Sequence, residues 1–280
     1  MSLTTLKRNI ISWYINSRGW RTERKIVVFE SDDWGSIRMP SKEIFNEFLA
    51  EGMPIDKLEY LKYDSLESNK DLESLLDLLI SFRDTNGQHP VITANTIMTN
   101  PDFEKIRNSD FQEYHFELFT ETLNRYPKHE KVIDLYKKGL ENKVFFPQFH
   151  GREHLNINRW MKALQNSSSN ARKAFDRNFF DLSTRYDEIT EERFVDALNA
   201  SVNEDLDDQG KRLTEGAQIF ENIFGFRSRS FIAPCYIWHP KIEQCLEKIG
   251  VNIIQTSSLQ RIPVLNEKNR FKKKYTSRVK

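Results

Sequence analysis

Short apolar runs alternate with longer amphipathic stretches along this chain. The short runs have the length and composition of β-strands, and they cover residues 25–30, 90–95, 143–149, 229–233 and 251–255. Between them, apolar residues recur at helical spacing in 42–51, 71–83, 111–126, 131–141, 158–165, 191–200, 214–224 and 240–249. Strands that alternate with helices are typical of parallel β/α units. The pattern therefore predicts one α/β domain with a parallel sheet and helical insertions.

The two ends of the chain differ from this central region. We assign residues 25–260 to the β/α domain and residues 1–24 to a basic amphipathic segment. Residues 261–280 carry eight Lys or Arg against one Glu and lack an apolar strand pattern, which predicts a basic tail. The N-terminal segment has an apolar helical face formed by Leu3, Leu6, Ile10 and Trp13. We expect this face to pack on the domain, and peripheral contact with an anionic membrane is the alternative.

The composition narrows the class of protein. The 280 residues include 42 basic and 41 acidic side chains, and a net charge of +1 gives no general basic field for nucleic acid. No run of about 18 apolar residues predicts a transmembrane segment. Lys7, Arg8 and Asn9 interrupt the first apolar run, so we expect no secretory leader. Because Cys235 and Cys245 are then expected to be reduced thiols, we expect a cytoplasmic location.

Side chains suited to metal binding and acid–base chemistry follow two of the predicted strands. Asp32 and Asp33 follow the first strand, and His150 and His154 follow the third. Taken alone, adjacent aspartates are typical of a turn or cap, and paired histidines are typical of an exposed helix face. In parallel β/α folds, however, functional side chains gather at the carboxyl ends of the strands. The sequence therefore predicts that these four residues converge.

The four residues favour a metal site with two roles for the aspartates. His150 and His154 are four positions apart, which on one turn of helix would let both imidazoles share a metal. Because adjacent side chains at a strand end diverge, one aspartate can bind the metal while the other faces the substrate. A carboxylate beside a water that the metal activates can take its proton. We therefore predict that one aspartate is a ligand and the other a general base.

A second interpretation of the histidines stays open. Residues 150–154 read H-G-R-E-H, which matches the inverted zinc-peptidase motif with Glu153 as the base. That motif lies on a long helix. Pro147 and Gly151 instead favour a strand that runs into a loop, and a peptidase would leave the two aspartates without a role.

On these residues, the chain resembles the NodB-like polysaccharide deacetylase superfamily, which includes carbohydrate esterase family four. Residues 30–35, E-S-D-D-W-G, resemble the family's T-F-D-D-G-type strand end, and H-G-R-E-H resembles its H-[ST]-x-x-H motif. Residues 229–236, R-S-F-I-A-P-C-Y, resemble its R-x-P-Y/G-type segment. The three motifs are short and lie between about residues 26 and 256 of the chain.

The resemblance implies a deformed (β/α) barrel with fewer than eight strands. It implies a divalent metal, usually zinc, and removal of an acetyl group from a carbohydrate by N- or O-deacetylation. Carried over to matching positions, it implies Asp32 as general base and Asp33, His150 and His154 as the metal ligands.

Three positions depart from the family pattern. Gly151 stands where the family has Ser or Thr, Ile232 stands where it has an Arg, and no His follows Val251 to act as the family's late general acid. Two interpretations remain open. Either the protein is an enzyme whose last strands are missing from this sequence or divergent, or it is a carbohydrate-binding protein that has kept the metal residues.

Four further residues are candidates for substrate binding: Trp34, Arg229, Tyr236 and Trp238. The aromatic rings could stack on the C–H faces of a sugar, although a chain with 20 Phe could equally bury them in its core. Arg229 is a candidate because the family's arginine is not at its usual position.

Overall fold

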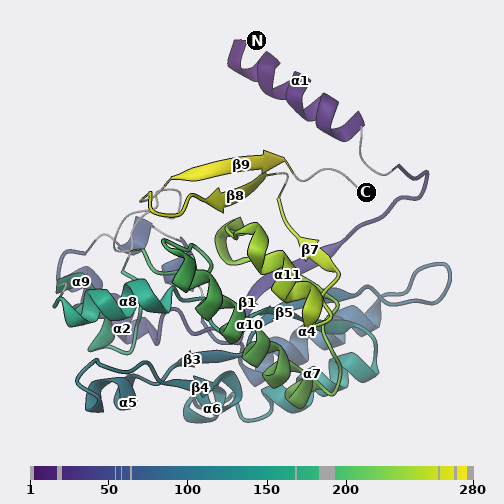
Figure 1. Cartoon of the computed structure of the whole chain (residues 1–280). Helices are drawn as coiled ribbons and strands as arrows, with labels where there is room; N and C mark the ends of the chain where they lie inside the picture. Colours follow the sequence, from purple (N-terminus) through teal and green to yellow (C-terminus); the bar gives the residue numbers. More distant parts are fainter. Residues whose placement is uncertain are drawn as a thin grey trace.

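The computed structural model describes residues 3–17, 21–53, 55–57, 59–63, 65–167, 169–182, 193–257, 259–267 and 270–275. Its centre is a five-stranded parallel sheet, curled into half a barrel, with the strand order β1-β2-β5-β6-β7 (Figure 1). The strands are β1 (Phe29–Trp34), β2 (Ile92–Ile97), β5 (Phe145–Gly151), β6 (Ser230–Ile232) and β7 (Ile253–Gln255). Each predicted strand region contributes one of them, and the order in the sheet is the order in the chain. The predicted α/β class with a parallel sheet is confirmed.

The predicted bounds of the first strand are wrong in a way that matters for function. Residues 25–28 are not strand, and Val27 and Val28 are 75% and 67% exposed. Pairing with β2 begins only at Phe29, opposite Ile92, because β2 itself begins there. β1 therefore continues through both aspartates to Trp34. The apolar residues 26–28 favoured a strand that starts earlier, but they lie in solvent before the edge strand begins.

Most predicted helices are present. The six that match are α2 (Lys42–Ala50), α4 (Asn69–Ser81), α7 (Val132–Glu141), α8 (Ile157–Gln165), α10 (Asn203–Phe224) and α11 (Pro240–Lys248). Helix α1 (Leu3–Ser17) matches the helical face predicted for the N-terminal segment. The remaining helices are short: η1 (Ile55–Lys57), α3 (Glu59–Tyr63), α5 (Phe103–Asn108), α6 (Phe119–Arg125), α9 (Ser169–Phe175) and η2 (Pro234–Tyr236).

Two predicted helices and the predicted tail are wrong. Within 111–126, β4 (Phe116–Leu118) pairs with β3 (Thr99–Pro101) before α6 begins, and Phe111 has φ 60°, which interrupts a helix. Residues 193–200, the described part of 191–200, form a largely buried loop held by side-chain contacts. In the predicted tail, β9 (Phe271–Tyr275) pairs with β8 (Leu259–Pro263). An exposed hairpin needs no apolar face, so its lysines gave no strand signal.

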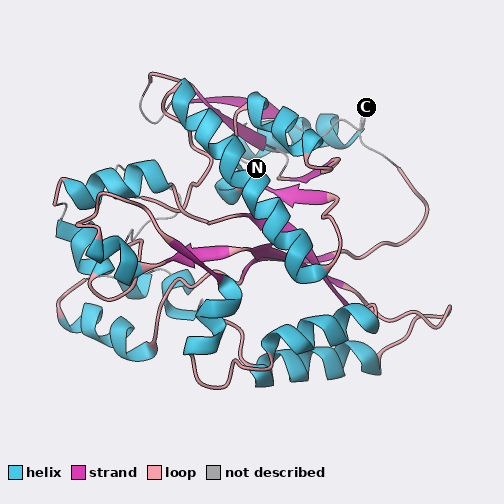
Figure 2. Cartoon of the chain, turned by 60° about the horizontal axis from the view of Figure 1, so that its bottom comes forward, coloured by secondary structure: helices cyan, strands magenta, loops and turns pink. Residues whose placement is uncertain are grey.

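The two faces of the central sheet have different chemistry. Ala94, Phe145, Phe149 and Phe231 face a core that also contains apolar residues of α4, α7, α10 and α11. Because side chains alternate along a strand, the residues between them face the other way. That second face carries Asp32, Asn95, Gln148 and His150. Figure 2 shows the sheet between the surrounding helices. The core thus holds one face of the sheet, and the polar side chains lie on the second face.

Candidate metal centre

Asp33, His150 and His154 form a compact group at the carboxyl ends of β1 and β5. Oδ1 of Asp33 lies 3.2 Å from Nε2 of His150 and 3.2 Å from Nε2 of His154. One ligand atom from each residue lies within 4.8 Å of the others. The two imidazoles are buried, and the Asp33 side chain is 16% exposed. The convergence predicted for these three residues is therefore present.

A local break in β1 directs Asp33 into this group. The pairing of β1 with β2 is irregular between Ser31 and Trp34, and Asp33 has φ 68°. Gly35 follows at φ 78°, where a Cβ atom would lie only 2.7 Å from the backbone oxygen of Ile97. Left-handed backbone at a non-glycine residue costs roughly 1–3 kcal/mol and is concentrated at functional sites. The strain here turns Asp32 and Asp33 to different partners.

Hydrogen bonding fixes which nitrogen His150 offers. Its Nδ1 donates to the backbone oxygen of Ile232 at 2.8 Å. Since a carbonyl oxygen only accepts, Nδ1 carries a proton, and in the neutral ring Nε2 is the nitrogen whose lone pair can bind an ion. Burial lowers the pKa of His154 to about 3, so this imidazole is neutral at physiological pH. Its Nδ1 is buried without a hydrogen-bond partner among the described residues.

Arg38 keeps Asp33 ionised. Its Nη2 donates to Oδ2 of Asp33 at 2.6 Å, and Arg38 is itself buried. Burial alone would raise the pKa of Asp33, but the charge of the Arg38 guanidinium opposes burial, and that pKa lies well below its usual range. The carboxylate is therefore charged, with Oδ2 held by Arg38 and Oδ1 directed at the histidines.

These residues fit a divalent cation. Two neutral imidazoles and one carboxylate are a ligand set that zinc and related first-row ions accept, and three protein ligands are typical of catalytic sites. Ligand atoms about 2.1 Å from one ion are at most about 4.2 Å apart, and the two separations of 3.2 Å from Oδ1 of Asp33 satisfy this limit. A candidate metal-binding group at Asp33, His150 and His154 is thus present, whereas zinc as its ion stays a prediction.

The histidines reach this geometry without a helix. His150 is the penultimate residue of β5, and His154 lies in the loop that follows. Gly151 between them has φ 128°, which other residues rarely adopt, and the ring centroids lie 5.1 Å apart. The helical spacing argument was therefore wrong, while the prediction that a strand runs into a loop here is confirmed.

Asp32 faces solvent beside the triad and is oriented by a neighbour. Nδ2 of Asn95, on β2, donates to Oδ1 of Asp32 at 2.9 Å. Asn95 is fully buried, and its own Oδ1 has no hydrogen-bond partner among the described residues. From the sequence, Asn95 is a weak candidate, because a lone asparagine near a strand end is typical of a turn.

The four predicted substrate residues are not brought together. Trp34 packs edge-on against Tyr136 and Phe145 in the core, at centroid distances of 6.2 and 5.0 Å. Trp238 is buried and donates its Nε1 hydrogen to Glu243. Both tryptophans therefore serve the core.

The other two candidates lie on the surface. Arg229 is exposed and precedes β6, so its backbone lies at the end of that strand away from the triad. Tyr236 follows β6, is 38% exposed and has φ 56°. Burial, followed by the charge of Asp32, raises the pKa of Tyr236. Tyr236 is the candidate that remains beside Asp32.

Glu153 points into a separate ion-pair cluster. Its Oε1 accepts from Nε of Arg152 at 2.6 Å, and Arg152 also pairs with Glu215 on α10. Helix α10 approaches this segment closely, since a Cβ atom on Gly216 would lie 2.9 Å from the Cα atom of Arg152. Burial raises the pKa of Glu153, and the charge of Arg152 partly offsets this. Arg152, which bonds both Glu153 and Glu215, thus links this loop to α10.

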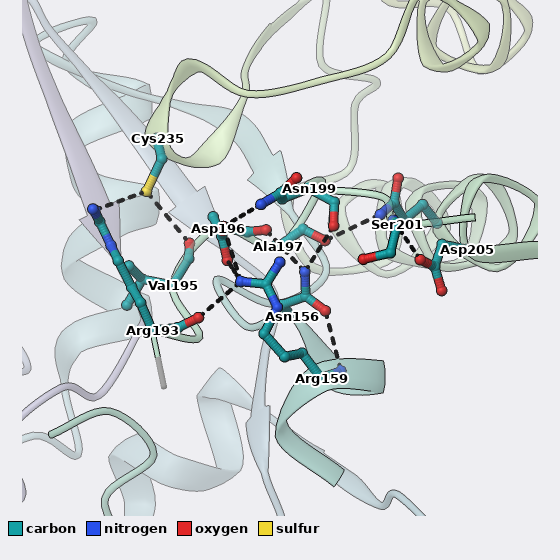
Figure 3. A network of polar contacts seen from close by, with 11 residues as sticks. Asn156, Arg159, Arg193, Val195, Asp196, Ala197, Asn199, Ser201, Asp205 and Cys235 are labelled. Carbon is teal, nitrogen blue, oxygen red and sulfur yellow. Dashed lines mark hydrogen bonds and ion pairs between the residues drawn. The ribbon is translucent and has the colours of Figure 1, made fainter. Parts of the chain in front are cut away.

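A buried polar network holds the loop of residues 193–200 and joins it to the segment after β6. Arg159 donates to both carboxylate oxygens of Asp196 at 3.0 and 3.1 Å, and Asn199 donates to Asp196 at 2.7 Å (Figure 3). The Arg193 guanidinium donates to the sulfur of Cys235 at 3.5 Å. Burial raises the pKa of this thiol to about 12, so Cys235 is not an activated nucleophile.

We expect Asp196→Ala to reduce the free energy of unfolding by about 3 kcal/mol. The substitution leaves the Arg159 guanidinium and the Asn199 amide without their shared buried acceptor. Urea unfolding measures the change. Asp207→Ala, which removes an exposed carboxylate from α10, is the matched control and should change stability by less than about 0.5 kcal/mol. Equal effects of the two substitutions would contradict a structural role for the network.

Comparisons with known proteins add little to this geometry. No family model matches the chain, and no curated protein matches it. Among solved structures, the chain is similar to a 4-alpha-glucanotransferase from Thermococcus litoralis, with 8% sequence identity and a TM-score of 0.36. The likeness covers 81% of this chain and 21% of the glucanotransferase chain, about a fifth of its length. A likeness this weak carries no conclusion about fold or function.

Proposed function

We propose that this protein is a metal-dependent hydrolase that removes an acetyl group from a carbohydrate, on a deformed β/α barrel of the NodB-like type. The observation that carries the proposal is the placement of two adjacent aspartates. Asp33 joins the histidine pair, while Asp32 faces solvent and is held by Asn95. That is the division of labour that hydrolysis by an activated water requires.

Each residue then has a distinct role. Asp33, His150 and His154 would hold the ion, which when bound lowers the pKa of water and polarises the acyl oxygen. Arg38 keeps Asp33 charged, and the Ile232 carbonyl keeps Nε2 of His150 available. Asp32 takes a proton from the attacking water as the water oxygen bonds to the acetyl carbon. The protonated Asp32 can return that proton to the departing nitrogen or oxygen, which releases acetate and the free sugar group.

The carbohydrate class rests on two supports. The first is the resemblance of the aspartate, histidine and Arg229–Tyr236 motifs, in that order, to the deacetylase superfamily. The second is Tyr236, whose partly exposed ring lies close enough to Asp32 for that carboxylate to perturb its pKa. A ring in this place could stack on a sugar whose acetyl group reaches Asp32.

A carbohydrate-binding protein on the same scaffold is the second candidate. It is favoured by the position of His239, which caps α11 by accepting from the Lys241 backbone and does not belong to the metal-binding group. Among the described residues, a third imidazole at the triad is thus missing as a general acid. Loss of such an acid costs about 10²–10⁴ in rate and leaves slow turnover.

The direct test is acetate release. The zinc-loaded and the chelator-treated protein are incubated with N-acetylated and O-acetylated oligosaccharides. We expect acetate only with the loaded protein. Sugar binding without acetate release at any metal load would contradict the hydrolase and support the binding protein.

The zinc-peptidase interpretation predicts that a different substitution abolishes turnover. In a peptidase Glu153→Gln would abolish turnover, whereas we expect it to change acetate release by less than about tenfold, because Glu153 bonds Arg152 and not Asp33. Gln can still accept the hydrogen bond from Arg152, which limits the structural damage. Peptide hydrolysis by the wild type that Glu153→Gln removes would contradict our assignment.

A further inference from the structure

Helix α1 (Leu3–Ser17) lies apart from the α/β body in Figure 1. Ile10 is 57% exposed and Trp13 is 71% exposed. The expectation that the apolar face packs on the domain is therefore wrong for these side chains. An isolated helix of about 15 residues is only marginally stable in water, so a surface that covers this face would stabilise α1.

The exposed face has the pattern of a helix that lies at an interface. Leu6, Ile10 and Trp13 recur at intervals of four and three residues, which places them on one stripe along α1. Lys7 borders the stripe, and Arg8 lies further round on the polar side. An indole combines an apolar body with a polar N–H, which suits the boundary between hydrocarbon and headgroups.

The charge of this segment indicates which kind of surface covers the apolar face of α1. Residues 1–22 have no Asp or Glu and contain the basic residues Lys7, Arg8, Arg18 and Arg21. Two copies of α1 paired along the stripe would bring like charges together, whereas anionic headgroups would neutralise them. A helix of this length spans about 22 Å, and none of the helices in the described ranges is long and apolar enough to cross a bilayer.

We propose that α1 binds in the plane of a membrane surface that contains anionic phospholipids. Leu6, Ile10 and Trp13 insert at the boundary with the acyl chains, and Lys7 at the edge of the stripe contacts the phosphates. Arg8, on the polar side, adds positive charge within about one Debye length of the surface. The proposal is independent of the proposed function, because the metal-binding group contains no residue of α1. Failure of one therefore leaves the other unaffected.

Vesicle sedimentation tests the proposal on the full chain. We expect binding to vesicles of equimolar phosphatidylcholine and phosphatidylglycerol, weakened by salt, and little binding to phosphatidylcholine alone. Lys7→Gln with Arg8→Gln should weaken binding about 25-fold, since each basic residue near an anionic surface contributes roughly fivefold. Gln keeps a similar helix propensity. Ile10→Ser with Trp13→Ser should weaken binding at least about tenfold.

A matched control accompanies the double variants. Ser12→Asn changes the polar side of α1, away from the stripe, and should leave vesicle binding unchanged. Equal binding to both vesicle types, no binding to either, or binding that survives both double variants would overturn the proposal. A dimer in light scattering that Ile10→Ser with Trp13→Ser dissociates, without vesicle binding, would overturn it in favour of a second copy. An unchanged unfolding midpoint shows that each variant keeps the α/β body intact.

Discussion

Asp32→Asn should reduce acetate release by about 10²–10⁴-fold while the protein keeps its bound metal. Asn is nearly isosteric with Asp and can still bond Asn95, but it cannot accept the proton of the attacking water. Asp32 has its own partner on β2 and lies outside the metal-binding group. The loss should therefore fall on turnover and leave the metal site intact. Steady-state kinetics and elemental analysis of the same sample measure the two quantities.

Glu30→Gln is the matched control for this substitution. Glu30 is an exposed carboxylate on the same strand, two residues before Asp32, and faces the same side of the sheet. Its removal should leave turnover within a few-fold of wild type, because it is further from the triad along β1. If Asp32→Asn instead removes the metal, the roles of the two aspartates are reversed. If it changes neither quantity, Asp32 is not the base.

His150→Ala should lower the affinity of the protein for zinc by more than about 100-fold. Loss of a hydrogen-bonded partner behind a metal ligand already costs about 10–100-fold, and this substitution removes the ligand itself. The remaining Asp33 and His154 would offer one carboxylate and one imidazole. Isothermal titration with zinc measures the affinity, and circular dichroism checks that the variant is folded.

His89→Ala controls for the loss of a histidine as such. His89 is partly exposed in the loop before β2, where its Nδ1 bonds the Phe82 carbonyl. This variant should bind zinc like the wild type. Equal affinity in His150→Ala and the wild type would place the metal elsewhere or exclude it, and the proposed hydrolysis would then lose its basis.

The sequence predicts the arrangement of the sheet because each strand leaves a local signal. Runs such as 143–149 are apolar, short and bounded by polar residues, and parallel connections place their carboxyl ends at one edge. The same logic predicts that Asp33, His150 and His154 converge. The distances of 3.2 Å between their ligand atoms follow from that convergence.

The residues that support the site could not be predicted in the same way. Asn95 bonds an aspartate 63 positions earlier, so nothing in its neighbourhood marks it. Arg38 is close to Asp33 in sequence, but it reaches back only because the chain turns at Gly35. Such contacts depend on how the loop folds, and no periodic pattern records them.

Two aromatic residues were predicted to lie at the site but do not. Trp34 and Trp238 are near the site in sequence, yet their rings belong to the core on the other face of the sheet. A strand places neighbouring side chains on opposite faces, so adjacency to Asp33 is a poor guide to adjacency in space. Exposure separates Tyr236 from the two tryptophans, and exposure is not visible in the sequence.

The location of a bound ion is the most direct test of the metal centre. Crystals grown with zinc and measured at the zinc absorption edge would give an anomalous difference map. We predict one strong peak about 2.0–2.2 Å from Oδ1 of Asp33 and from Nε2 of both His150 and His154. A map without a peak there, or with the peak at another group of residues, would contradict the account.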